Sequence, residues 1–270
     1  MSATNGNHRP VVLVGCGRLG SAILDGWLTT GAVPPADLIV LTPSDKPVAG
    51  IARAHGARIN PPLEALSEAR AVVLAVKPAK WREATRPLIS HLPADAVIVS
   101  VMAGVRSAVM GGALSPRPVV RVMPTTAVAQ AQGIAAIWAV DAAARAAAHG
   151  LFAALARIVD LDEERHIDVA TAVAGSGPAY VHAFTRALAE AGAASGLDAD
   201  SALALARGAV RSAAAADPAD TLDALIARVA SPGGTTEAGL KALNAGRALD
   251  EAVEAAVAAA LLRACELSRD

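Results

Sequence analysis

The chain has 270 residues, of which 54% are hydrophobic and only 2% aromatic, and its charges nearly balance at a net charge of −1. This length allows one large domain or two ordinary ones, and the balanced charge gives no footprint for nucleic acid or for a membrane surface. No apolar run reaches the roughly 18 residues of a membrane-spanning helix, and two distant cysteines form neither a disulfide framework nor a metal cluster. We therefore expect a cytoplasmic protein without bound metal.

The beginning of the chain predicts a nucleotide site. Residues 1–9 are polar and are expected to form a disordered tail without the apolar core of a signal peptide. The apolar run Val11–Val14 predicts a buried strand, G-x-G-x-x-G follows at Gly15–Gly20, and helical spacing continues through residues 21–28. Strand, glycine loop and helix in this order are the context in which the loop binds a dinucleotide.

Each glycine of this loop has a physical task. Gly15 permits the turn, Gly17 lets a pyrophosphate approach the backbone, and Gly20 lets the helix pack on the strand. Arg18 and Leu19 stand between the last two glycines, at the start of the helix. We expect all five residues to contact the cofactor.

The end of the second predicted strand, Leu38–Leu41, indicates which dinucleotide binds. An NAD site usually has an acidic residue there, whereas this chain has the hydroxyls of Thr42 and Ser44, followed by Lys46. These groups can hold a 2′-phosphate, so we expect NADPH to be preferred and NADH to remain possible. The alternatives are an ordinary proline turn, or Asp45 turning inward to the ribose.

Four further apolar runs alternate with helical segments. They cover residues 71–76, 97–102, 119–124 and 133–138. Alternation of this kind predicts an α/β fold, a Rossmann-type doubly wound parallel sheet with right-handed crossovers. The ligand then lies beyond the carboxyl ends of the strands. We expect further cofactor contacts from the residues at two of these ends, namely Val76, Lys77, Pro78, Ala103 and Gly104, although Lys77 could be only a solvated charge.

The remainder of the chain is predicted to be helical. A helix over 142–158 and an acidic connector at 160–164 end the alternation, which divides the chain into a Rossmann domain at 10–165 and a helical domain at 166–270. Further helices are expected at 179–194, 199–215, 221–230 and 247–267. In the last one, Leu249, Val253, Val257 and Leu261 form an apolar stripe. Such an Ala-rich segment makes a thin core and favours pairing with a second subunit.

A second glycine loop, Ser231–Thr236, precedes another helical segment. Free N–H groups and the helix dipole at a helix start favour a bound carboxylate or phosphate. The alternative is a simple helix start with Thr235 or Thr236 as N-cap. The six histidines show no metal-ligand spacing, and the chain contains no G-x-S-x-G nucleophile elbow.

Three segments in fixed order carry a resemblance to a known family. These are Gly15–Gly20, the GSGPAY segment Gly175–Tyr180 and the SPGGTT segment Ser231–Thr236. Together they resemble pyrroline-5-carboxylate reductase over nearly the whole chain, and the segments Ala75–Pro78 and Val122–Pro124 also match the family pattern.

The resemblance implies a Rossmann domain that binds NAD(P)H and a helical domain that interleaves with its partner, giving a homodimer or a ring of dimers. Hydride passes to C5 of a cyclic imino acid, 1-pyrroline-5-carboxylate, and yields L-proline in the last step of proline biosynthesis. The substrate carboxylate is implied to bind at Ser231, Gly233, Gly234, Thr235 and Thr236. Thr236 is implied to lie near the ring nitrogen, where it donates or relays a proton. A protonated C=N is already electrophilic, so orientation and exclusion of water suffice.

Three departures from the family pattern accompany these matches. Thr125–Ala127 replaces N-T-P after Met123-Pro124, Asn60 stands out of register with the family's asparagine, and Asp220 is the nearest substitute for an expected acidic residue. Two other functions remain open. Another NAD(P)H-dependent imine or hydroxy-acid oxidoreductase is one, although the 179–194 helix carries Arg186 and lacks the lysine usual in hydroxy-acid enzymes. A catalytically silent nucleotide-binding homologue is the other, and the intact Ser231–Thr236 loop counts against it.

Overall fold

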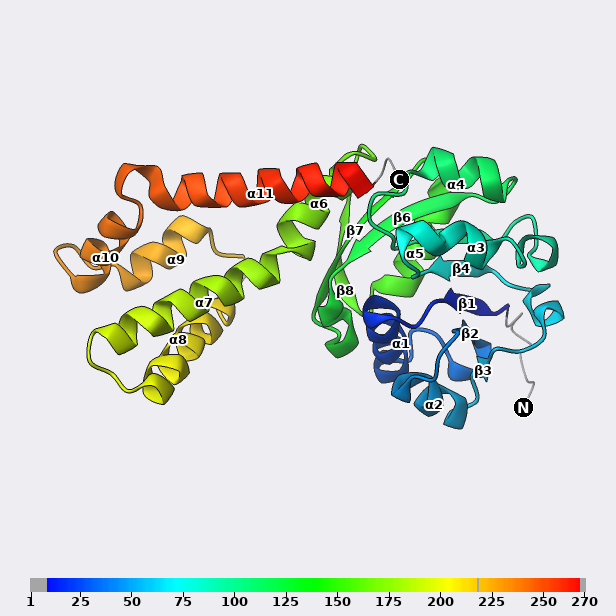
Figure 1. The fold of residues 1–270 in the computed structure, drawn as a ribbon, viewed down its shortest axis with the longest axis horizontal. Helices are drawn as coiled ribbons and strands as arrows, with labels where there is room; N and C mark the ends of the chain where they lie inside the picture. Colours follow the sequence, from blue (N-terminus) through cyan, green and yellow to red (C-terminus); the bar gives the residue numbers. More distant parts are fainter. Residues whose placement is uncertain (1–8, 218, 268–270) are drawn as a thin grey trace. The chain divides into compact units, whose positions relative to one another are not determined.

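The computed structural model describes residues 9–217 and 219–267, which form two compact units. One unit, here called the sheet unit, runs to Gly175 and includes the residues from Ala260 onward; the other, the helical unit, comprises Ser176–Ala259 (Figure 1). Residues 1–8 of the predicted tail and 268–270 of the predicted helical domain lie outside the described residues. Arg9, the last residue of that predicted tail, pairs with Asp95 at 2.7 Å between Nη1 and Oδ2.

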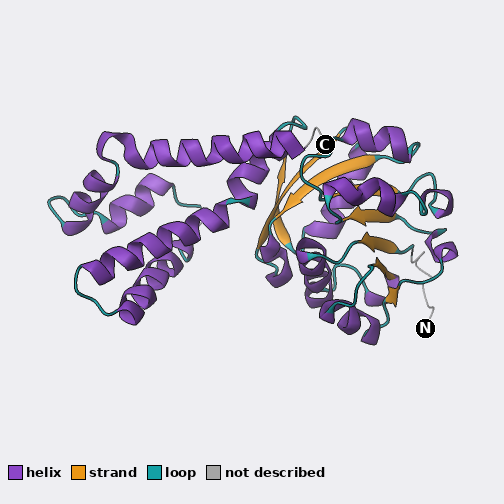
Figure 2. Ribbon diagram, viewed as in Figure 1, coloured by secondary structure: helices purple, strands orange, loops and turns teal. Residues whose placement is uncertain are grey.

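The sheet unit contains an eight-stranded sheet in the order β3-β2-β1-β4-β5-β6-β7-β8 (Figure 2). The strands are β1 Val11–Val14, β2 Leu38–Leu41, β3 Arg58–Ile59, β4 Ala71–Leu74, β5 Val97–Ser100, β6 Val119–Pro124, β7 Gly133–Ala139 and β8 Ala156–Asp160. Every pair is parallel except β6 with β7. The strands after β1 are added first on one side of it, as β2 and β3, and then on the other, from β4 onward. The first glycine loop follows β1 at this switch point, which is where doubly wound folds bind ligands. The predicted fold class is confirmed.

Alternate residues of the buried strands supply two separate cores. The helices of this unit are α1 Arg18–Thr30, α2 Pro47–Ala54, α3 Trp81–Thr85, α4 Ser107–Leu114, α5 Ala142–Phe152 and α6 His166–Ala170. Val11 and Leu13 pack with apolar residues of α1 and α5, whereas Val12 and Val14 pack with those of α3 and α4. The sheet therefore has helices on both faces, and both faces of the central strands are apolar, as the uninterrupted runs in the sequence predict.

The structure corrects two features of the predicted sheet. The helix predicted over 142–158 ends at Phe152, and Ala156–Asp160 forms β8 at the sheet edge instead. The alanines favour helix, but Arg157, Ile158 and Val159 pair with β7. In addition, β7 is antiparallel to β6 because only the eight residues 125–132 join them, too few for a crossover.

The helical unit contains no strand among its described residues. Its helices are α7 Gly177–Ala194, α8 Ala199–Ala214, α9 Leu222–Val229, α10 Thr235–Leu243 and the first part of α11 Ala248–Leu267. Side-chain caps set two starts: Asp198 accepts from Ser201 N at 2.9 Å, and Thr221 accepts from Ala224 N at 3.2 Å. The predicted helices are all present, with ends shifted by a few residues.

No helix among the described residues combines the length and apolar character needed to cross a membrane. The described residues also bring together no group of three or more histidine, cysteine, aspartate or glutamate side chains able to hold a metal ion.

Candidate functional site

The first glycine loop is shaped by two close approaches of backbone to backbone. Gly15 has φ +95°, and a Cβ there would lie 2.7 Å from the carbonyl oxygen of Ala75. A Cβ on Gly20 would lie 2.1 Å from the carbonyl oxygen of Gly15, whereas a Cβ on Gly17 would meet nothing within 4 Å. The absence of a Cβ at Gly15 and Gly20 therefore permits close packing of the backbone, and Gly17 leaves open space beside the backbone.

The start of α1 suits an anion. Its N-cap is Gly17, no side chain caps it, and its first turn carries no acidic residue. Arg18 is exposed and Leu19 partly buried. The first N–H groups of a helix have no intrahelical acceptor, so a pyrophosphate at this point meets backbone donors and the positive end of the helix dipole.

A cavity of about 640 Å³ adjoins the loop. Backbone and side chains of Gly15, Thr42, Asn60 and Val76 contribute to its wall. The rest of the wall is mostly apolar, with Pro43, Pro61, Leu63 and Leu88 among its residues, and it includes the charged Lys80 and Glu83. A mostly apolar cavity beside the start of α1 can accommodate the adenosine portion of a dinucleotide.

Asn60 is the residue of this cavity that sequence reasoning set aside as out of register. Its Oδ1 accepts from Thr42 N and its Nδ2 donates to Thr42 O, both at 2.8 Å. Asn60 thereby fixes the chain after β2, although it adopts a positive φ of 48°. Asparagine tolerates a positive φ better than most residues, but no local pattern in the sequence indicates its bonds to Thr42.

A second cavity of about 370 Å³ is also lined by Thr42. Lys46 and Arg53 line it together with Asp45 and Gly50 of the turn and α2. Thr42 itself is 7% exposed, and its hydroxyl donates to Ser44 O at 3.0 Å. Of the three residues predicted to select the cofactor, Lys46 lines this cavity, Ser44 is exposed beside it in sequence, and Thr42 uses its hydroxyl within the turn.

The strand-end residues predicted to contact the cofactor follow β4 and β5. Lys77 is exposed, Pro78 begins a short 3₁₀ turn, and Val76 lines the larger cavity. Ala103 and Gly104 form the turn after β5, where Gly104 has φ +76°. The sheet unit thus brings the predicted cofactor residues to one edge of the sheet.

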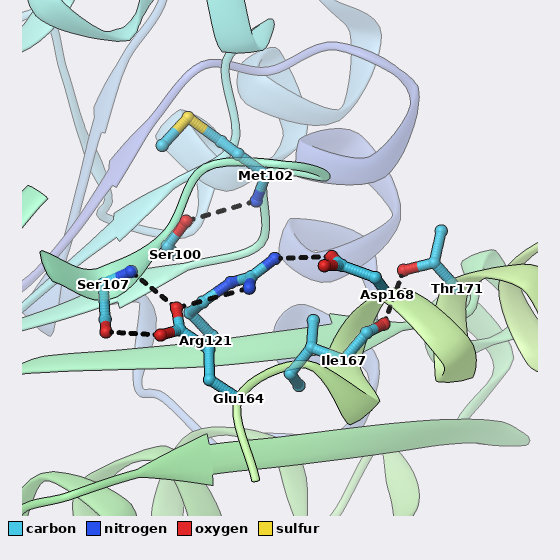
Figure 3. A network of polar contacts seen from close by, with 8 residues as sticks. All are labelled: Ser100, Met102, Ser107, Arg121, Glu164, Ile167, Asp168 and Thr171. Carbon is cyan, nitrogen blue, oxygen red and sulfur yellow. Dashed lines mark hydrogen bonds and ion pairs between the residues drawn. The ribbon is translucent and has the colours of Figure 1, made fainter. Parts of the chain in front are cut away.

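A buried polar network lies beneath the turn after β5 (Figure 3). Arg121 of β6 is 1% exposed and donates from Nη1 to Glu164 at 3.3 Å and from Nη2 to Asp168 at 3.1 Å. Glu164 also accepts from Ser107 at the start of α4, from the backbone N at 2.6 Å and from Oγ at 3.0 Å. The Nε of Arg121 has no partner among the described residues. One carboxylate therefore joins α4, β6 and the approach to α6, which sequence reasoning did not predict.

The second glycine loop belongs to the helical unit. Gly233 has φ +72°, and Gly234 N donates to Ser231 O at 2.9 Å, closing a turn. Gly234 is the N-cap of α10, with no side-chain cap, so the alternative N-cap at Thr235 or Thr236 is wrong. Both threonines are exposed and lie in the first turn of the helix. Glu237 instead serves the loop: its Oε2 accepts from Gly233 N at 2.5 Å.

Two residues at which the chain departs from the family pattern already have partners. Asp220 forms a paired contact with Arg228 of α9, at 2.6 and 3.0 Å, which occupies both carboxylate oxygens. Thr125 accepts from Ile134 N through Oγ1 at 3.2 Å and so fixes the turn between β6 and β7. In this structure, Asp220 and Thr125 have local structural tasks.

Comparison with known proteins finds family matches in the N-terminal and the C-terminal part of the chain. A family model described as pyrroline-5-carboxylate reductase dimerisation matches residues 164–267, and a model described as NADP oxidoreductase coenzyme F420-dependent matches residues 10–104. The latter supports a nicotinamide cofactor for the sheet unit. The Pseudomonas aeruginosa pyrroline-5-carboxylate reductase is 35% identical and the match covers 96% of each chain; the Thermus thermophilus reductase is 35% identical over 95% of this chain and 98% of its own.

Solved structures agree with these sequence matches. The Coxiella burnetii pyrroline-5-carboxylate reductase superposes with a TM-score of 0.87 at 28% identity, covering 97% of this chain and 99% of that one. The fold is also shared with the NADP-bound Plasmodium falciparum enzyme, with a TM-score of 0.78 at 23% identity and coverage of 96% and 98%. The resemblance inferred from three sequence segments is confirmed, and the chain belongs to the pyrroline-5-carboxylate reductase family of oxidoreductases.

Proposed function

We propose that the protein reduces 1-pyrroline-5-carboxylate to L-proline with a nicotinamide nucleotide as hydride donor, the last step of proline biosynthesis. The observation that carries the proposal is full-length similarity to several reductases of this name in a chain that keeps both glycine loops. The free thiols of Cys16 and Cys265 fit a cytoplasmic setting. For the domains we propose residues 10–165 and 166–270, with support from the dimerisation match that begins at 164.

In the proposed site the sheet unit holds the cofactor. Backbone groups of Gly15, Gly17, Arg18, Leu19 and Gly20 cradle the pyrophosphate, because α1 starts without a side-chain cap or an acidic first turn. Val76, Lys77 and Pro78 border one side of the cofactor and Ala103 and Gly104 another. When bound, the nicotinamide supplies the hydride that is added to C5 of the imine.

The helical unit supplies the substrate cradle. We assign Ser231, Gly233, Gly234, Thr235 and Thr236 to the substrate carboxylate, since the start of α10 presents backbone N–H groups and two exposed hydroxyls. The hydroxyl of Thr236 donates or relays a proton to the ring nitrogen. Neither hydride transfer nor the proton transfer requires a metal, because a protonated C=N already accepts hydride. The loop needs only to orient the substrate.

The assay that tests this function follows loss of reduced nicotinamide absorbance with 1-pyrroline-5-carboxylate as substrate. 1-Pyrroline, which has the same ring without the carboxylate, is the matched control. We expect rapid turnover with the first and poor turnover with the second, because the Ser231–Thr236 loop recognises the carboxylate. Binding of NADPH and NADH without oxidation of either would favour a silent homologue. Equal turnover of both imines would contradict the proposal that the Ser231–Thr236 loop binds the substrate carboxylate.

Thr236→Ala tests the proton role. Loss of one positioned donor or proton relay is expected to lower kcat by roughly ten- to a thousand-fold. Thr236→Ser keeps a hydroxyl and should recover part of the rate, whereas Thr235→Ala should act mainly on KM. Wild-type kcat in Thr236→Ala would remove this residue from the mechanism.

We further propose that NADPH is preferred over NADH. The support is the cavity beside Thr42, which Lys46 and Arg53 line as the cationic side chains; Ser44 adds an exposed hydroxyl, and Asp45 is the acidic group that opposes a phosphate there. Lys46→Gln and Arg53→Gln should each raise the KM for NADPH roughly tenfold, the loss of about one charge-assisted contact, with little change for NADH. Equal losses for both cofactors would contradict a 2′-phosphate site.

For the partner we propose a second copy of this chain, as a homodimer or a ring of dimers built through the helical unit. Val181, Phe184 and Leu188 of α7 are 46%, 46% and 41% exposed and follow helical spacing along one face. Large apolar side chains left open in this number are typical of an interaction surface. The match to a dimerisation model covers the same helices.

A further inference from the structure

We infer that Glu164 is a positioning residue for the cofactor: its carboxylate anchors the start of α4 and so fixes the Ala103–Gly104 turn after β5. The inference rests on the proposed function in one respect, namely that this turn borders the cofactor. Its structural basis is the network of Figure 3, in which all members belong to the sheet unit.

The first step is the contact between Glu164 and α4. The N-cap position of α4 is Arg106, which provides no side-chain cap. The cap instead comes from 57 residues away: both Glu164 oxygens accept from Ser107, one from the backbone N at 2.6 Å and the other from Oγ at 3.0 Å. A carboxylate at a helix start receives charge-assisted hydrogen bonds and the favourable field of the helix dipole.

The second step is the support of Glu164 itself. Arg121 is 1% exposed on the interior strand β6; its Nη1 donates to Glu164 at 3.3 Å, and its Nη2 donates to Asp168 at 3.1 Å. The side chain of Glu164 is 21% exposed and that of Asp168 is 10% exposed. A guanidinium buried in a strand has a fixed position, and its rigid fork orients both carboxylates. The carboxylate of Glu164 therefore lies between Arg121 and Ser107 and contacts both (Figure 3).

Ser107 lies close in the chain to the Ala103–Gly104 turn, which we propose borders the cofactor. Only residues 105 and 106 separate Ser107 from Gly104, and Val105 is buried while Gly104 has φ +76°. At the other end of the turn, Met102 N donates to the buried Ser100 Oγ at 3.4 Å. Ser100 therefore fixes one end of the turn and Glu164 the other, which leaves the backbone of Ala103 and Gly104 pre-organised rather than free to move.

Asp168 provides a matched control within the same network. It pairs with the same Arg121 and is more buried than Glu164, but no hydrogen bond joins it to α4 among the described residues. Removing either carboxylate weakens the support of a buried arginine. Only removal of Glu164 also frees the start of α4.

The experiment compares Glu164→Ala, Glu164→Gln and Asp168→Asn by NADP⁺ titration in a calorimeter and by thermal unfolding. We expect Glu164→Ala to raise the Kd for NADP⁺ roughly tenfold, the effect of losing one charge-assisted hydrogen-bonded anchor. Glu164→Gln keeps an oxygen that can accept from Ser107 N and should recover most of the affinity. Asp168→Asn should lower the Tm and leave the Kd for NADP⁺ within about twofold.

Two results would overturn the inference: an unchanged Kd for NADP⁺ in Glu164→Ala, or an equal rise in Asp168→Asn. If Glu164→Ala does not fold, Ser107→Ala removes one of the two contacts without touching a buried charge, and it should raise the Kd about threefold; no rise would then refute the inference. Wild-type protein that binds neither NADP⁺ nor NAD⁺ would instead contradict the proposed function, so the two failures are distinguishable.

Discussion

The two units of this chain differ in how they treat large apolar side chains. In the sheet unit, Leu13, Ile23, Trp27 and Phe152 are fully buried, and the indole of Trp27 donates to Leu151 O at 2.8 Å inside the core. In the helical unit, the buried hydrophobic residues are small, namely Ala189, Ala202 and Ala206, whereas large ones such as Leu222 are open, at 77% exposure.

This difference shows that the two units obtain their stability in different ways. The sheet unit has a core of fully buried large side chains, each contributing about 1.5–3 kcal/mol to its stability. Helices packed through alanine methyl groups bury little area, so the helical unit needs a further surface to cover its apolar faces. The proposed cofactor site then belongs to the unit with the large buried core, and the proposed substrate cradle belongs to the unit with open apolar faces.

The largest effect should come from a single methyl group in the sheet unit. In Gly20→Ala the new Cβ would lie 2.1 Å from the carbonyl oxygen of Gly15, a backbone atom that cannot step aside. We expect unfolding free energy to fall by about 2 kcal/mol or more, with loss of NADP⁺ binding. Gly17→Ala, whose Cβ meets nothing within 4 Å, should keep the wild-type Tm and only weaken NADP⁺. Equal Tm values for both variants would show that close packing does not hold this loop.

The next effect concerns the open face of the helical unit. Phe184→Glu should raise the dimer dissociation constant by at least about thirtyfold, as for a central aromatic interface residue, measured by analytical ultracentrifugation over a range of concentrations. Val140→Glu is the control, because Val140 is 87% exposed in the sheet unit, and it should leave the assembly unchanged. A Phe184→Glu protein that assembles like the wild type would mean that another face of the helical unit pairs.

The contrast between the units also explains what the sequence could predict. The buried strands are read directly from runs such as Val11–Val14, because both faces of a parallel strand are apolar. The glycine loop is likewise recognisable from a short pattern, because Gly15, Gly17 and Gly20 stand at fixed spacing between a strand and a helix. Local patterns therefore predicted the main strands of the sheet and the glycine loop after β1, and three local segments pointed to the family.

The features that sequence reasoning missed depend on contacts between distant residues. β8 follows an alanine-rich helix, and only pairing with β7 selects strand for Arg157 and Ile158. Glu164 caps a helix 57 residues earlier in the chain, so no capping pattern within α4 announces it. The side chain of Asn60, after β3, forms hydrogen bonds with the backbone of Thr42, after the neighbouring strand β2. Composition and spacing contain no record of these approaches.

The smallest expected effect concerns the starts of α1 and α10, the two helix starts that we assign to anions. The first turn of α1 has no acidic residue, whereas α10 carries Glu237, whose carboxylate already accepts from Gly233 N at 2.5 Å. A second carboxylate, that of the substrate, must share this position with a like charge. Glu237→Gln keeps an acceptor for the loop and removes the charge. We therefore expect the KM for 1-pyrroline-5-carboxylate to fall about threefold at low salt, a surface-charge effect.

Ionic strength separates this charge effect from a purely structural one. Repulsion between exposed carboxylates is screened within roughly 10 Å at 0.1 M salt, so the advantage of Glu237→Gln should shrink as salt is added. The matched variant Glu251→Gln removes a likewise exposed carboxylate in the first turn of α11 and should leave KM unchanged. If Glu237→Gln raised KM instead, the carboxylate would be required to shape the loop, and the two helix starts would differ in how they are built rather than in how strongly they attract an anion.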